Sequence, residues 1–128
     1  MSKASAPSQR MLRAGELIRH ALADVFMRGD TGDPELEKIG VSVVEVQMSP
    51  DLQIATVFVR PLIHGQEQKL LYACTRNQRY MRGLIAPRLD MKFMPQLKFR
   101  LDTALDYAGK IDELLHRPDV ARDLKKDD

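Results

Sequence analysis

The sequence predicts a single α+β domain with elements in the order α-β-β-α-α-β, followed by one more short helix. Three observations support this prediction. Two segments rich in β-branched residues flank a Ser-Pro-Asp turn at residues 49–51, and a third segment near residue 100 alternates apolar and basic side chains. The segments before, between and after these three have the spacing of amphipathic helices. A length of 128 residues is typical of one domain.

The first helix is predicted to begin after Ser8, whose side chain is a suitable N-cap. Arg10 and Arg13 lie at the edge of its apolar face, where their stems pack and their charged ends reach water. Residues 1–7 are small and polar, which predicts a flexible leader. Glycine, aspartate and proline at residues 29–34 predict the end of the helix and an acidic loop. The apolar face comprises Met11, Ala14, Ile18, Ala21, Leu22 and Val25.

Residues 39–48 and 53–60 are predicted to form a hairpin of two strands. Pro50, in the turn between them, supplies the fixed φ angle of a tight turn. In the first strand the apolar alternation runs as far as Val43 and then changes phase at Val44. This change indicates either a β-bulge or a strand that is buried on both faces.

Residues 66–89 are predicted to form a long cationic helix with a bend in its middle. Asn77 and Gln78 have weaker helix propensity than their neighbours, so the bend is expected there. The ring of Pro87 clashes with a continuing helix, so the helix is expected to end or kink near Ala86. Its apolar side is predicted to comprise Leu70, Leu71, Cys74, Met81, Leu84, Ile85 and Leu89.

The last predicted elements are a strand and a short helix. In residues 96–101 apolar side chains alternate with Lys98 and Arg100, so the two basic side chains should share the outer face of a strand. Residues 104–116 have the pattern of a short amphipathic helix. Residues 117–128 are charged and poor in apolar side chains, which predicts a disordered tail.

The distribution of charge gives the strongest indication of function. Residues 69–100 carry eight basic side chains and one acid, Asp90, so their local balance is +7. Residues 30–68 carry seven acids and two basic side chains, a balance of −5. A concentrated positive segment attracts a polyanion, and nucleic acid is the leading candidate. A solvated helix rich in Lys and Arg would produce the same charge run without any ligand.

The composition gives little support to catalysis. His20, His64 and His116 are scattered without metal-ligand spacing, and no glycine-rich phosphate loop is present. The single cysteine, Cys74, lies on an apolar helical side and is expected to be a core residue. One cysteine cannot form an internal disulfide, and no apolar run approaches the ~18 residues of a membrane span. We therefore expect a soluble cytoplasmic protein that is not an enzyme and needs no cofactor or metal.

Four stretches of the sequence resemble the ribosome-binding factor A family of bacterial small-subunit assembly factors. The most specific combination is Val-Gln-Met-Ser-Pro-Asp-Leu followed by an alternating strand and, later, Met-Pro-Gln-Leu-Lys-Phe. The similarity extends from about Ser8 to Leu115, which is most of the chain. The four stretches are Gln9-Arg10-Met11, residues 46–52 with the strand at residues 55–59, residues 94–99, and residues 110–115.

The resemblance implies a type II KH-like RNA-binding domain at residues 8–116, with the order α-β-β-α-(kink)-α-β plus the short C-terminal helix. In such a domain helices cover one face of a three-stranded sheet. Ordinary KH domains hold the nucleic-acid backbone with a Gly-x-x-Gly loop between two helices. The family has an Ala-x-Gly kink instead, and this chain has Asn77-Gln78-Arg79 at the matching place.

The same resemblance implies a function in ribosome biogenesis. It predicts a protein, monomeric when free, that binds 16S rRNA in the immature 30S subunit near the decoding end. The protein would assist late maturation and rRNA processing, including during cold adaptation, without a membrane or a small-molecule substrate. A protein–protein adaptor remains the alternative, with the acidic loop and the basic helix binding different partners.

The candidate RNA-binding residues follow from the charge pattern and the resemblance together. Each could instead be an exposed side chain that only keeps the surface solvated. Tyr72 and Tyr80 could stack on bases, but single aromatic residues on a helix are more often packing residues. The candidates are Arg76, Asn77, Arg79 and Arg82 around the kink, Arg88 and Lys92 beyond it, Lys98 and Arg100 on the third strand, and Arg10 and Arg13 on the first helix.

Overall fold

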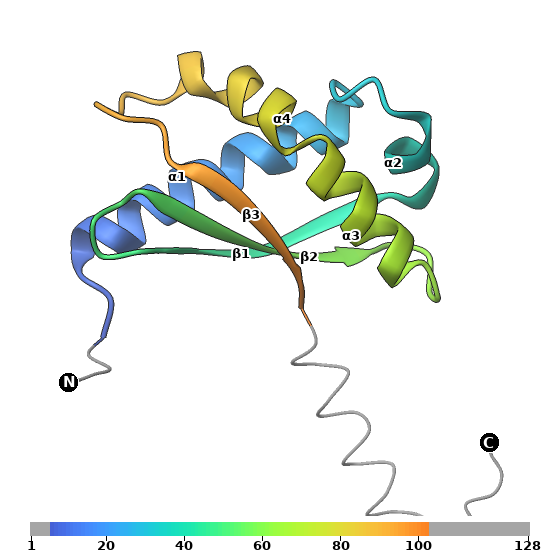
Figure 1. Ribbon diagram of the computed structural model, residues 1–128, viewed down its shortest axis with the longest axis horizontal. Helices are drawn as coiled ribbons and strands as arrows, with labels where there is room; N and C mark the ends of the chain where they lie inside the picture. Colours follow the sequence, from blue (N-terminus) through green and yellow to red (C-terminus); the bar gives the residue numbers. More distant parts are fainter. Residues whose placement is uncertain (1–5, 103–128) are drawn as a thin grey trace, which may run out of the picture.

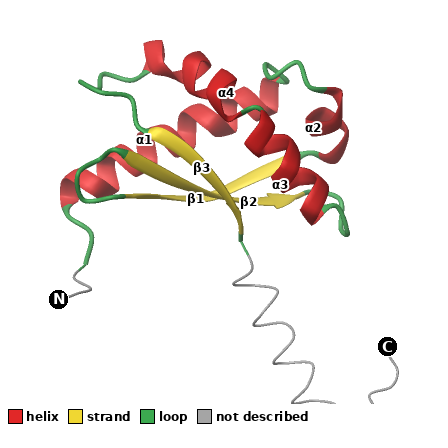
Figure 2. Ribbon diagram, in the orientation of Figure 1, coloured by secondary structure: helices red, strands yellow, loops and turns green. Residues whose placement is uncertain are grey.

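The computed structural model describes residues 6–102 and has the predicted α+β architecture (Figure 1). Figure 2 shows one sheet with its helices gathered on one face, the arrangement that the resemblance implies. The elements are α1 (Gln9–Arg28), α2 (Pro34–Ile39), β1 (Val41–Met48), β2 (Ile54–Pro61), α3 (Glu67–Arg76), α4 (Gln78–Ile85), the 3₁₀ turn η1 (Ala86–Arg88) and β3 (Gln96–Leu101).

The sheet has the strand order β1-β2-β3, so β2 is central and β3 is an edge strand. β1 and β2 are antiparallel, as expected for a hairpin, and β3 is parallel to β2. The phase change in β1 is a β-bulge, because the pairing register shifts between Val43 and Glu45. Lys98 and Arg100 are exposed on β3, while the alternating Leu97 and Phe99 are buried, as predicted.

α1 begins and packs as the sequence predicts. The Ser8 hydroxyl accepts a hydrogen bond from the Met11 amide at 3.1 Å, which caps the helix. Gly15 lets α1 approach β1 closely, because a Cβ atom there would lie 2.5 Å from the Val46 carbonyl oxygen. Gly29 ends the helix with a left-handed φ of 71°. The core formed with α3, α4 and the sheet includes Ile18, Leu22, Leu70, Met81, Ile85 and Leu97, all fully buried.

The acidic segment after α1 differs from the prediction. Residues 34–39 form the short helix α2 rather than a loop, and β1 begins at Val41 rather than at residue 39. The Asp33 carboxylate caps this helix by accepting from the Glu35 amide at 3.0 Å. Pro34 occupies the first turn, where a proline does not disrupt a helix. Pro34 therefore starts a helix here and is not part of the loop that the sequence predicts.

The long basic helix is broken where the sequence predicts a bend. α3 ends at Arg76 and α4 begins at Gln78, with Asn77 between them. The predicted helix at residues 104–116, the tail at residues 117–128 and most of the predicted leader lie outside the described residues. The division of the chain into leader, domain and tail stays a prediction.

Candidate nucleic-acid interface

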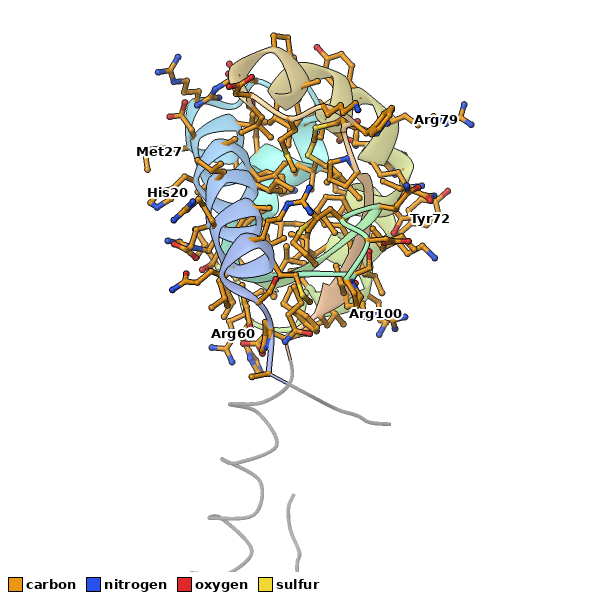
Figure 3. The ribbon with its side chains drawn as sticks, turned by 90° about the vertical axis from the view of Figure 1, so that its left-hand side faces the viewer. His20, Met27, Arg60, Tyr72, Arg79 and Arg100 are labelled. Carbon is orange, nitrogen blue, oxygen red and sulfur yellow. The ribbon has the colours of Figure 1, made fainter. Side chains whose placement is uncertain are left out.

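Three of the predicted RNA-binding residues, on α4 and β3, have exposed side chains that form no hydrogen bond or ion pair within residues 6–102. Arg79 extends from α4, and Lys98 and Arg100 extend from β3. Figure 3 shows Arg79 and Arg100, together with Tyr72, on one side of the molecule. His20 and Met27 lie on the opposite side (Figure 3). We call the surface formed by Tyr72, Arg79, Lys98 and Arg100 the basic side.

The part of α4 next to Arg79 is open to a close approach from outside. Gly83 lies four residues after Arg79, so the two positions share a helix face. Gly83 is exposed, and a Cβ atom added there would meet nothing within 4 Å. A glycine inside a helix costs about 1 kcal/mol relative to alanine. The packing of the protein does not require this glycine, and its missing side chain leaves room for a sugar–phosphate backbone.

Arg76 and Asn77 are instead bound to the N-terminus of α2. The Arg76 guanidinium lies 2.8 Å from the Asp33 carboxylate and 3.1 Å from that of Glu35. The Asn77 amide donates to Asp33 at 2.7 Å and to the Ala73 carbonyl at 2.8 Å. We call Asp33, Arg76 and Asn77 the kink clamp, because they join α2 to the break between α3 and α4.

The kink clamp changes the electrostatics of its central carboxylate. Hydrogen bonds from Arg76 and then Asn77 hold the pKa of Asp33 below its ordinary value, although partial burial acts in the opposite direction. The Asp33 side chain is only 12% exposed, so little water competes for these bonds. Much of the Arg76 charge is therefore offset inside the molecule before any ligand arrives.

Arg82 and Arg88 also have partners inside the molecule. Arg82 donates to the carbonyl oxygens of Pro95 at 3.0 Å and Met94 at 2.6 Å, so it holds the loop that leads into β3. Arg88 lies 2.8 Å from the Asp24 carboxylate on α1. Each of the two side chains thus connects α4 or the turn after it to another part of the fold. Their role in RNA binding stays a prediction.

The remaining candidates lie together at a second place. Arg10 and Arg13 on α1 and Lys92 in the loop before β3 line a groove of about 640 Å³. Phe93, which was not among the predicted site residues, lines the same groove and is 70% exposed. Phe93 is a single aromatic residue in a predicted loop and belongs to no periodic pattern. The only feature of the sequence that could have indicated it as a site residue is its position next to Lys92.

The two tyrosines of the basic helix are not packing residues. Tyr72 and Tyr80 are 67% and 54% exposed, which favours the first of the two roles that the sequence left open, base stacking, over packing. The Arg76 guanidinium lies 5.3 Å from the centre of the Tyr72 ring, a cation–π geometry. Tyr72 therefore places an accessible aromatic ring on the basic side.

Cys74 is fully buried, as predicted for a core residue. Burial raises the pKa of its thiol to about 12, so the thiolate form needed for nucleophilic chemistry is absent at neutral pH. Within residues 6–102, three or more His, Cys, Asp or Glu side chains nowhere gather in a metal-binding group. In the same range no helix has the length and apolar character required to cross a membrane.

Comparison with known sequences assigns the family. A family model described as ribosome-binding factor A matches residues 10–115. Ribosome-binding factor A of Chelativorans sp. strain BNC1 is 54% identical over 121 residues, which cover 94% of this chain and 90% of the relative. Ribosome-binding factor A of Azorhizobium caulinodans is 52% identical over 120 residues, which cover 94% of this chain and 83% of the relative.

Solved structures agree with the sequence comparison. The crystal structure of ribosome-binding factor A from Thermus thermophilus aligns with a TM-score of 0.60 at 25% identity, covering 71% of this chain and 94% of that one. A homology model of the Thermus thermophilus factor, fitted into a cryo-EM map of a 30S complex, aligns with a TM-score of 0.54 at 25% identity, covering 68% and 89%. The chain described here belongs to the ribosome-binding factor A family.

Proposed function

We propose that this protein binds the 30S ribosomal subunit through 16S rRNA and assists late maturation and rRNA processing, including at low temperature. The observation that carries the proposal is the basic side, where Arg79, Lys98 and Arg100 are exposed and have no partner within residues 6–102. Phosphate contacts from such side chains supply much of the affinity of RNA-binding proteins. A relative from Thermus thermophilus has been fitted into a map of a 30S complex, which supports the same partner here.

The proposed activity is binding rather than catalysis. The thiol of Cys74 is buried and protonated, and the basic side combines cations with an aromatic ring, the chemistry of nucleic-acid recognition. We propose that the protein acts in the cytoplasm, where bacterial subunits are assembled, and that it is a monomer until it binds.

The adaptor alternative has less support. It assigned different partners to the acidic segment and to the basic helix. Two carboxylates of that segment, Asp33 and Glu35, contact Arg76 in the same molecule. They are therefore already engaged by the basic helix, which leaves the unpaired cations of the basic side as the stronger candidate surface.

The test removes two unpaired cations and compares them with two paired ones. Arg79→Gln with Arg100→Gln should weaken binding to immature 30S particles about tenfold or more at physiological salt, because two phosphate contacts are lost. Surface substitutions of this kind change stability by about 0.5 kcal/mol or less, so the melting temperature should stay near that of the parent. Quantitative co-sedimentation over a concentration series measures the affinity.

The matched control carries Arg19→Gln with Arg28→Gln on α1, which makes the same change in net charge. These arginines pair with Glu16 and Asp24, so their charges are already offset. The control should bind as the parent does. Ultraviolet crosslinking of the parent to immature particles should then yield 16S rRNA nucleotides. Equal affinity of both double variants, or crosslinks to ribosomal proteins alone, would overturn the proposal.

A further inference from the structure

A groove separate from the basic side lies at one end of the molecule. Its walls are the first turns of α1, the turn between β1 and β2, and the loop before β3. Figure 1 shows the start of α1 and the β1–β2 turn close together at this end. The groove holds about 640 Å³, within the range of about 300–1,000 Å³ of small-molecule-sized sites.

The walls of the groove combine positive charge with an accessible aromatic ring. Arg10, Arg13 and Lys92 line it, and the two guanidinium groups form no ion pair or hydrogen bond within residues 6–102. The Lys92 ammonium lies 5.7 Å from the centre of the Phe93 ring. Phe93 is 70% exposed, so one face of a large apolar side chain stays in contact with water.

Two acids also line the groove, and one of them has local partners. The Asp51 carboxylate accepts hydrogen bonds from the Ser49 hydroxyl at 2.6 Å and from the backbone N–H of Gln53 at 3.1 Å, within the β1–β2 turn. Asp90, in the loop before β3, is exposed. Three cations against two acids leave a positive balance, which is complementary to a phosphate chain.

We propose that this groove holds an unpaired nucleotide of single-stranded RNA, with its base on the Phe93 ring and its phosphates near Arg10, Arg13 and Lys92. The inference rests on the proposed function, because it takes the partner to be RNA. Inside a duplex the two faces of a base are stacked against neighbouring bases and are not accessible to a side chain. An unpaired base can instead stack its face on an aromatic ring. The groove therefore selects unpaired RNA, while cations on the basic side would hold the backbone of either form.

The absence of tryptophan in this chain allows a direct test. Phe93→Trp in the full-length chain keeps an aromatic ring in the groove and makes it the only tryptophan. A single-stranded RNA oligonucleotide should quench the fluorescence of this tryptophan in a saturable way. A duplex RNA of the same length should quench it much less, because its bases are already stacked.

The matched control is Met27→Trp, which places the only tryptophan elsewhere on α1. Met27 is 83% exposed and lies ten residues after Leu17, the last α1 residue of the groove, or about 15 Å along the helix. Its fluorescence should not change with either RNA. The inference would be overturned by equal quenching at both positions, or by equal quenching of the Phe93→Trp variant by single-stranded and duplex RNA.

Substitutions without a tryptophan test the energetics of the same site. Phe93→Ala should weaken binding of the single-stranded oligonucleotide between about fivefold and a hundredfold, the effect of losing one stacked base. Phe93→Tyr keeps the stacking surface and should restore binding. Arg10→Gln with Arg13→Gln should weaken binding and flatten its salt dependence.

These variants separate failure of the groove from failure of the proposed function. If Phe93→Ala binds the single strand as the parent does while the Arg79 and Arg100 double variant loses 30S binding, the groove inference is wrong and the proposed function stands. If both bind as the parent does, neither surface contacts RNA. The folded state of each variant is checked by its melting temperature.

Discussion

At the scale of the residue, the guanidinium of Arg82 acts as a structural group. It donates to the Pro95 and Met94 carbonyls and so joins α4 to the loop before β3. Arg79, three residues earlier on the same helix, is exposed and has no such partner within residues 6–102. Charge reversal at both positions would therefore combine a change in binding with damage to the loop.

The different roles of these two arginines lead to a prediction about stability. Arg82→Met keeps a long stem but removes both donors, so the carbonyl oxygens of Met94 and Pro95 lose their charged partner. The free energy of unfolding should fall by about 1–3 kcal/mol. Arg79→Met makes the same chemical change on the same helix and should stay within about 0.5 kcal/mol of the parent. Urea denaturation of both variants measures the difference, and equal stabilities would show that the Arg82 bonds contribute nothing.

At this scale the sequence predicted which residues are cationic but not which of them are paired. The acceptors of Arg82 lie 12 and 13 residues away along the chain, and Asp24 lies 64 residues from Arg88. Such partners depend on tertiary structure and leave no local pattern. Local patterns did succeed where the contact is local, as in the Ser8 cap of α1.

At the scale of the element, the kink clamp connects three helices through one carboxylate. Asp33 caps α2 by accepting from the Glu35 amide, and its other oxygen accepts from Arg76 and Asn77 at the break between α3 and α4. The clamp therefore fixes how α4 leaves α3. Since Arg79 and Gly83 lie on α4, the direction of this helix decides where the basic side presents them.

The clamp leads to a prediction about pH. Asp33→Asn keeps the helix cap but removes the charge that binds Arg76, so stability at neutral pH should fall by about 1–3 kcal/mol. The pKa of Asp33 is lower in the folded than in the unfolded chain. Its contribution is therefore complete above the unfolded value of about 3.9 and is lost as the pH falls through the lower folded value.

Denaturation at several pH values measures this contribution. The stability difference between parent and Asp33→Asn should be constant near neutral pH and should shrink below about pH 4. Glu37→Gln makes the same charge change at an exposed position of α2 and serves as the control. A difference that stays constant down to about pH 2 would show that the charge of Asp33 does not stabilise the fold.

The elements were predictable where their pattern is local and strong. The alternation of β3, the phase change of β1 and the weak helix formers at Asn77 and Gln78 each had the predicted structural consequence. α2 was missed because six residues are too few for a helical period to be recognised. Its cap Asp33 and the following Pro34 were a usable signal, but the same residues are also typical of a turn.

At the scale of the whole molecule, the fold brings the acidic and basic segments together. Residues 69–100 have a balance of +7, yet Arg76 pairs with Asp33 and Glu35, and Arg88 pairs with Asp24. The surface is therefore less positive than the segment. The cationic side chains that form no ion pair within residues 6–102 include those of the basic side and those of the groove. The sequence could predict the excess of charge but not this division.

The division of charge leads to a prediction about salt dependence. Each phosphate contact contributes about 0.7–0.9 to the slope of log affinity against log salt concentration. Removing three unpaired cations, with Arg79→Gln, Lys98→Gln and Arg100→Gln together, should lower that slope by about 2–3. Isothermal titration of immature 30S particles at several salt concentrations provides the slopes for parent and variant.

The control removes three cations that the structure shows to be paired and that are not candidate RNA-binding residues, with Arg19→Gln, Arg28→Gln and Arg60→Gln. Their partners are Glu16, Asp24 and Asp102, so these charges are already offset and should contribute little to binding a phosphate. Both triple variants have the same net charge, and a slope set by net charge alone would fall equally in the two. A slope that falls only in the first would mean that position on the surface, rather than total charge, determines how many phosphates the protein contacts.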